Sequence, residues 1–191
     1  METWVLPALL GLGLAAASGF RTFLPLLMLS AAAHFELFGI HLNESFAWVG
    51  STGALVTLAI AAVAELTADL IPFVDNALSI VGNVSGPIAG VIAAGSVFTD
   101  LDPTTAAVAG IIVGAPTALA FSATQTGLRA TSSATTAGVG NPIVSLVEDV
   151  GTFLLSLLAL VLPILVPVAL GLLVWGIWRV VRRFRARRTP A

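Results

Sequence analysis

The stretch Leu6-Pro-Ala-Leu-Leu-Gly-Leu-Gly-Leu-Ala-Ala-Ala-Ser-Gly19-Phe-Arg21-Thr22 places an arginine directly behind an apolar run. The pattern recurs where the apolar run Ala106–Ala120 precedes Gly127-Leu-Arg129-Ala130. Arg21 and Arg129 are the only arginines outside the C-terminal tail, and the chain has no lysine. Ionisable groups inside a membrane are costly and usually mark a functional site. The pattern therefore predicts a duplicated membrane protein with a polar centre.

The composition excludes an ordinary soluble domain. Of the 191 residues, 58% are apolar and only 9% are charged, and the mean hydropathy is +1.04. A soluble domain carries about 25% charged residues. Long apolar stretches are typical of membrane helices, which satisfy their backbone hydrogen bonds internally. The absence of cysteine excludes disulfides, thiol nucleophiles and cysteine metal sites.

The C-terminal stretch Trp175-Gly-Ile-Trp178-Arg179-Val-Val-Arg182-Arg183-Phe-Arg185-Ala-Arg187-Arg188 sets the expected orientation. Arginines that follow an apolar run stay in the cytoplasm, and tryptophans mark the interface. The tail is either a topology signal alone or also a site for anionic lipid headgroups. The N-terminus lacks the basic region of a signal peptide, so we expect the first apolar run, Leu6–Ala17, to be retained as a membrane helix.

An all-α integral membrane protein of six to seven transmembrane helices follows from this orientation. We expect helices over residues 51–71, 77–97, 105–121, 141–160 and 161–181, the last bent by prolines, with external acidic loops at 36–50 and 98–103. The segment 122–140 is too polar and short to span, which indicates a re-entrant or protein-buried segment. Residues 19–35 either span, with the N-terminus outside, or are re-entrant, with the N-terminus inside.

Two structural repeats, inverted if each half has three spans, are expected. A shift of 80 positions pairs Asp69 with Asp149 and Pro87 with Pro167. The expected units are a first membrane repeat (1–98), an external acidic connector (99–104), a second repeat (105–178) and a cytoplasmic arginine-rich tail (179–191). Inversion predicts that Arg21 and Arg129 approach the membrane from opposite faces.

The candidate site residues are polar side chains at helical spacing in apolar surroundings. Glu65 and Asp69 share a helical face, and a polar stripe runs along 141–156. A helix N-terminus beside an arginine favours an anion. The expected substrate- or ion-binding residues are Arg21, Arg129, Glu65, Asp69, Glu148, Asp149, Asn141 and Ser145. The expected helix breaks or turns are at Gly19, Gly127, Pro25, Pro87, Pro142 and Pro167.

The sequence lacks the residue motifs of the enzyme classes considered for a membrane protein. The chain has neither a G-x-S-x-G nor an H-E-x-x-H motif. The glycine-framed aspartate motif of intramembrane aspartyl proteases is also missing. We therefore expect no catalytic activity, no cofactor, no metal site and no nucleic-acid partner.

Three segments resemble a family of small bacterial membrane proteins known as domain of unknown function 4126. They are Ser18-Gly-Phe-Arg-Thr-Phe-Leu-Pro25, the stretch from Glu65 to Asp75, and the stretch from Arg129 through Asp149. The resemblance implies a multi-pass protein of the bacterial inner membrane and implies no activity. The family pattern has a lysine directly after the aspartate equivalent to Asp69, where this chain has Leu70.

The expected function is transport of a small anionic solute, a lipid phosphate headgroup or ions, through a central arginine–carboxylate site between two repeats. Whether this transport is coupled to protons is left open. The alternative is a structural or assembly protein whose buried charges form internal salt bridges. The expected partners are the lipid bilayer and anionic lipid at the tail, and a homo-oligomer is left open.

Overall fold

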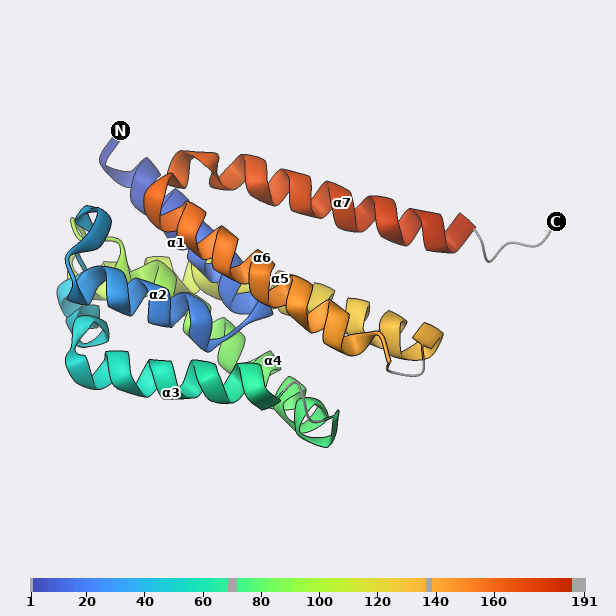
Figure 1. Cartoon of the computed structure of the whole chain (residues 1–191). Helices are drawn as coiled ribbons and strands as arrows, with labels where there is room; N and C mark the ends of the chain where they lie inside the picture. Colours follow the sequence, from blue (N-terminus) through green and yellow to red (C-terminus); the bar gives the residue numbers. More distant parts are fainter. Residues whose placement is uncertain (1, 69–71, 137–138, 187–191) are drawn as a thin grey trace.

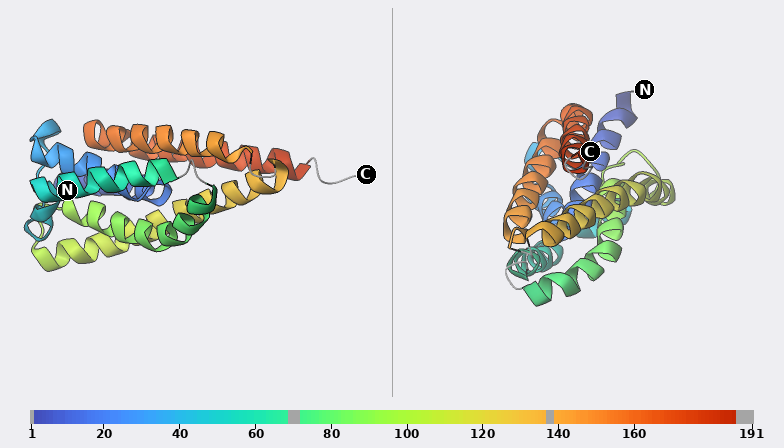
Figure 2. Two further views of the ribbon diagram at one scale, coloured as in Figure 1. Left: turned by 60° about the horizontal axis from the view of Figure 1, so that its bottom comes forward. Right: turned by 90° about the vertical axis from the view of Figure 1, so that its right-hand side faces the viewer.

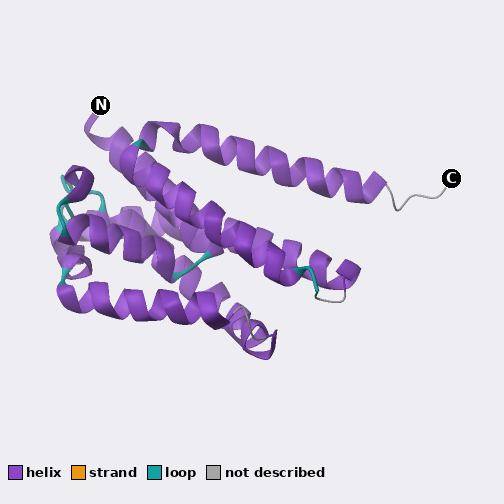
Figure 3. Cartoon of the chain, viewed as in Figure 1, coloured by secondary structure: helices purple, strands orange, loops and turns teal. Residues whose placement is uncertain are grey.

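The computed structural model describes residues 2–68, 72–136 and 139–186, and this part of the chain consists of helices joined by short loops and turns (Figure 1, Figure 3). This confirms the all-α class. The elements in chain order are α1 (Glu2–Phe20), α2 (Phe23–His34), η1 (Leu37–Gly39), η2 (Glu44–Gly50), α3 (Thr52–Ala68), α4 (Pro72–Ser96), α5 (Pro103–Thr136), α6 (Asn141–Val161), η3 (Pro163–Leu165) and α7 (Val166–Ala186).

Several of these helices are apolar enough for a membrane. Within the described ranges, α5 and α6 are long and apolar enough to span on their own, and η2 with α3 forms a third candidate that is bent by 63°. Shorter apolar helices include Trp4–Phe20, Phe23–His34 and Pro163–Arg179. These properties support a membrane protein, while the count of six to seven spans stays a prediction.

Helices α1 and α2 form a hairpin that turns back inside the bundle (Figure 1). The start of α1 and the end of α2 lie at the same end of the molecule as η1 and η2, and the C-terminus of α7 lies at the other end (Figure 1, Figure 2). The start of α1 thus lies on the side of the loop at 36–50 (Figure 1), and the choice between a spanning and a re-entrant segment at residues 19–35 stays a prediction. Helix α2 has only 12 residues.

The two acidic loops are joined by one buried side chain. Asn43 Nδ2 donates to the carbonyl oxygens of Phe98 and Leu101 at 2.9 and 2.8 Å. The backbone N–H of Asn43 donates to Ser96 O at 2.8 Å. In the second loop, hydrogen bonds from Thr105 lower the pKa of Asp102, which begins α5 as its N-cap. Both loops therefore form one end of the bundle.

Helices α4 and α5 meet along a stripe of small residues. Ala106, Gly110, Gly114, Ala118 and Ser122 are buried at a spacing of four residues along α5. A Cβ on Gly114 would overlap the carbonyl oxygen of Gly90 on α4. Small residues let helix backbones approach closely, which is how helices associate within lipid. Gly90 of α4 thus serves close packing against α5.

The prediction of a separate segment at 122–140 was wrong, because α5 continues through Gly127 to Thr136. Its hydroxyls bond to the helix itself. The side chains of Thr124, Thr131 and Thr135 each donate to the carbonyl oxygen four residues earlier, at 2.8 Å. A hydroxyl that bonds to its own helix needs no other polar partner. The many Ser and Thr residues in this segment are therefore compatible with a continuous helix and do not indicate a break.

The remaining predicted breaks divide into two groups. The chain does leave the helix two residues after Gly19, Pro142 lies in the first turn of α6, and Pro167 lies in the first turn of α7 after the break at η3. Pro25 likewise lies in the first turn of α2, directly after the turn at 21–22, where a proline removes no helical hydrogen bond. The predictions at Gly127 and Pro87 were wrong, because Gly127 lies inside α5 and Pro87 inside α4. The two Gly-x-Arg motifs therefore differ in backbone, and the inverted repeat stays a prediction.

Candidate functional site

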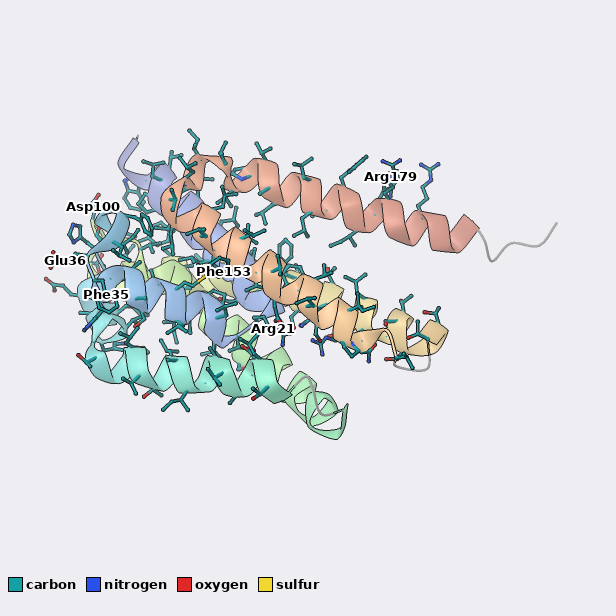
Figure 4. All side chains as sticks on the ribbon, in the orientation of Figure 1. Arg21, Phe35, Glu36, Asp100, Phe153 and Arg179 are labelled. Atoms are coloured by element: carbon teal, nitrogen blue, oxygen red, sulfur yellow. The ribbon has the colours of Figure 1, made fainter. Side chains whose placement is uncertain are left out.

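Four helices bring polar side chains to the turn between α1 and α2 in the interior of the bundle, where Figure 4 labels Arg21. We call this group the turn site. Its members are Arg21 and Thr22 of the turn, Glu65 of α3, Ser85 of α4, Gln125 and Arg129 of α5, and Ser145, Glu148 and Asp149 of α6.

The first ion pair joins the turn to α6. Arg21 Nε lies 2.5 Å from Asp149 Oδ1, and Arg21 Nη2 donates to the backbone oxygen of Ser145 at 3.5 Å. The Arg21 side chain is 3% exposed and that of Asp149 is 26% exposed. A guanidinium at this depth requires a partner, because burial of an unpaired charge is very costly. Asp149 is the more accessible member of the pair.

The second ion pair joins α5 to α6. Arg129 Nε and Nη2 donate to Glu148 Oε2 at 3.1 and 2.8 Å, and Nη2 also donates to Ser145 Oγ at 3.0 Å. Gln125 Nε2 donates to the same Glu148 oxygen and to Phe20 O, both at 2.9 Å. Ser145 therefore contacts both arginines, and Gln125 connects Glu148 to the end of α1.

Glu65 occupies the N-terminus of α2. Its Oε1 accepts from the Thr22 amide at 2.8 Å and its Oε2 accepts from the Phe23 amide at 3.1 Å. The Thr22 hydroxyl also lies 3.1 Å from the Ser85 hydroxyl of α4. A carboxylate is stabilised there by the free amides and the positive end of the helix dipole. The helix N-terminus expected near Arg21 exists, and this protein's own carboxylate occupies it.

The comparison with known proteins identifies the family. A sequence model of the family described as Domain of unknown function (DUF4126) matches residues 8–183. This chain belongs to the DUF4126 family. The match spans every residue of the turn site. No curated protein and no solved structure matches the chain.

The structure of this DUF4126 protein brings most of the predicted residues together. Arg21, Arg129, Glu65, Glu148, Asp149 and Ser145 all belong to the turn site. Asn141, at the start of α6, does not belong to it. Its Nδ2 donates instead to Oγ of Ser133 on α5 at 3.0 Å. Asp69 lies outside the described residues. No group of three or more His, Asp or Glu side chains in the described ranges is arranged to hold a metal ion.

Sequence reasoning missed Thr22, Ser85 and Gln125. Gln125 had a signal, because it lies four residues before Arg129 and so shares its helical face once α5 is continuous. No sequence pattern indicated Ser85, because its hydroxyl reaches Thr22 only through the packing of α4 beside the turn.

Replacing Glu65 with alanine should destabilise this DUF4126 protein by about 0.5–2 kcal/mol, the range for losing a side chain that caps a helix N-terminus. The amides of Thr22 and Phe23 would lose their carboxylate. Thermal unfolding in detergent measures the change. Glu36→Ala, at an exposed loop position, is the control. Equal melting temperatures for the two variants would show that Glu65 does not hold the turn.

Proposed function

We propose that this protein is a small membrane transporter that moves protons through the turn site. The observation that carries the proposal is the charge pairing there. Both arginines bind carboxylates, and a third carboxylate sits on the N-terminus of α2. A carboxylate holds an arginine strongly only while it is ionised, so protonation of Asp149 would release Arg21.

The shape of the α1–α2 hairpin supports a site at membrane depth. Helix α2, with 12 residues, is about 18 Å long at 1.5 Å per residue. The hydrocarbon core of a bilayer is about 30 Å thick. We therefore interpret the hairpin as re-entrant, with its turn inside the membrane. Interrupted helices whose ends face the midplane form the ion sites of many transporters.

The pairing favours protons over an anionic solute or a lipid phosphate. An anion would have to displace Glu148 from Arg129 or Asp149 from Arg21, and the displaced carboxylate would be left beside it. Like charges brought together in a buried site repel strongly. A proton instead binds to the carboxylate itself and reduces the negative charge of the site.

The orientation proposed from the sequence places the C-terminal tail in the cytoplasm of a bacterial cell. The guanidinium groups of Arg179 and Arg182 each lie 5.1 Å from the ring centre of Trp175 and Trp178 respectively. Tryptophans and arginines in this arrangement suit the headgroup region of a membrane. We extend the proposal to contact between this tail and anionic lipid headgroups.

A structural role is the second candidate, and the pairing of both arginines is the observation that favours it. Buried ion pairs that stay closed hold helices in register without moving. The two candidates differ in one measurable respect, because only a transporter moves protons across a sealed membrane.

Asp149→Asn should lower proton flux by about a hundredfold, the low end of what a positioned proton-transfer group contributes. The purified protein is reconstituted into liposomes that contain a pH-sensitive dye, and a potassium gradient with valinomycin supplies the driving force. Asp102→Asn, in the exposed loop before α5, is the matched control and should keep wild-type flux. Wild-type flux no higher than that of empty liposomes would reject transport and leave the structural role.

A further inference from the structure

Three buried oxygen atoms lie at four-residue intervals along one face of α6. They are Glu148 Oε1, Thr152 Oγ1 and Ser156 Oγ, and none of them hydrogen-bonds to another residue in the described part of the chain. Glu148 is 6% exposed, and Thr152 and Ser156 are 0% exposed. Buried polar atoms in proteins almost always have a partner, which is often an ordered water. We call these atoms the α6 oxygen row.

The two hydroxyls of the row differ from several other helical hydroxyls in this protein. Those of Ser18, Ser96 and Thr117 donate to the carbonyl oxygen four residues earlier, at 2.9, 2.5 and 2.6 Å. Thr152 and Ser156 make no such bond. Their buried oxygens therefore lack the partner that helical hydroxyls can find within their own helix.

The spacing of the row matches the size of a water molecule. Side chains four residues apart on a helix have Cβ atoms about 5–6 Å apart. Two hydrogen bonds of about 2.8 Å placed end to end span the same distance. One water can thus bridge Glu148 to Thr152, and a second can bridge Thr152 to Ser156. Each water would receive two polar partners from the row, as buried waters require.

We infer that the α6 oxygen row binds a short chain of water molecules that connects Glu148 to Ser156. This inference rests on the proposed function, in which the chain would relay protons to and from the turn site. The other Glu148 oxygen, Oε2, is held by Arg129 and Gln125, which leaves Oε1 to face the row. Glu148 is then the contact between the ion pairs and the water chain.

The row ends beneath an apolar cluster. Leu14, Ala159, Leu160 and Val166 pack together beyond Ser156, each no more than 5% exposed. An apolar cluster offers no polar partner to a water molecule, so the chain of water molecules stops at Ser156 in this conformation. Protons reach the far end of the bundle only when the cluster separates, which gives the transporter a closed and an open form.

Silver-ion accessibility tests the water chain without relying on transport. The protein has no native cysteine, so Thr152→Cys and Ser156→Cys each introduce one thiol. Leu155→Cys is the control, because Leu155 is also on α6 and buried but packs among Ala16 and Ala17. Silver is added to the folded protein, and the thiols left free are counted with a dye after denaturation. A hydrated cation pays several kcal/mol to enter a dry site, so the two row variants should react at least about tenfold faster than the control.

Equal, slow reaction of all three variants would overturn the inference, whether or not the wild type moves protons. A second comparison tests the relay in liposomes. Thr152→Val should lower proton flux about tenfold, the effect of losing one hydrogen bond from the path, while Thr117→Val should not. Fast silver reaction with no wild-type flux would reject the proposed transport and keep the water sites. Unchanged flux in Thr152→Val would remove the row from the proton path.

Discussion

Replacing Arg129 with alanine is expected to destabilise the protein by about 3–5 kcal/mol, the cost of removing one partner from a buried ion pair. Arg129 supplies two of the three donors to Glu148 Oε2, and the Glu148 side chain is 5% exposed. Without Arg129, Gln125 is the one donor to Glu148 Oε2 that remains among the described residues, and water barely reaches this carboxylate. Chemical unfolding in detergent, followed by circular dichroism, measures the loss.

A double variant separates charge from packing in this experiment. Arg129→Met with Glu148→Leu removes both charges and keeps similar volumes, so it should recover most of the lost stability. Arg179→Ala, which removes an exposed arginine near the tail, should cost less than about 1 kcal/mol. If Arg129→Ala were as mild as Arg179→Ala, the pair with Glu148 would contribute little to the fold, and neither the transport nor the structural proposal could rely on it.

Gly114→Ala is expected to destabilise the protein by about 1–3 kcal/mol, the usual cost of adding a methyl group to a packed interior. The added Cβ would overlap the carbonyl oxygen of Gly90, and backbone cannot rotate aside as a side chain can. Helices α4 and α5 would have to separate. Melting temperatures in detergent report the effect.

Gly127→Ala provides the matched control on the same helix. A Cβ on Gly127 would meet no atom within 4 Å. Alanine is a better helix former than glycine by about 1 kcal/mol, so this variant should be as stable as the wild type or more so. A loss of stability at Gly127 equal to that at Gly114 would contradict the close α4–α5 packing.

The charged residues of the turn site were predictable because charge is rare in this chain. A buried arginine must find a carboxylate, so the sequence alone indicated that Arg21 and Arg129 would meet acidic side chains. The sequence alone could not show which carboxylate pairs with which arginine. Glu65, which we expected to bind a substrate or ion, caps α2 instead, because the end of α3 lies beside the turn. Such a contact depends on how helices distant in the sequence pack together.

The two Gly-x-Arg motifs show where local sequence reasoning fails. After Gly19 the chain leaves the helix, while after Gly127 it stays helical. Gly19 packs against the backbone of Ala118, and Gly127 has open space around it. Glycine permits a turn but does not impose one, so the same motif takes different backbones according to the neighbouring helices.

The Asn43 contacts affect how this bundle can deform. Three hydrogen bonds from one buried residue join the loop after α2 to the loop between α4 and α5. These bonds hold the two loops together at that end of the bundle. A motion that separates α2 from α4 and α5 there must break all three bonds. The break at Leu162, between α6 and α7, carries no comparable link in the described residues. We therefore expect bending at η3, directly beside the apolar cluster that closes the α6 oxygen row, to meet less resistance than separation at the Asn43 end.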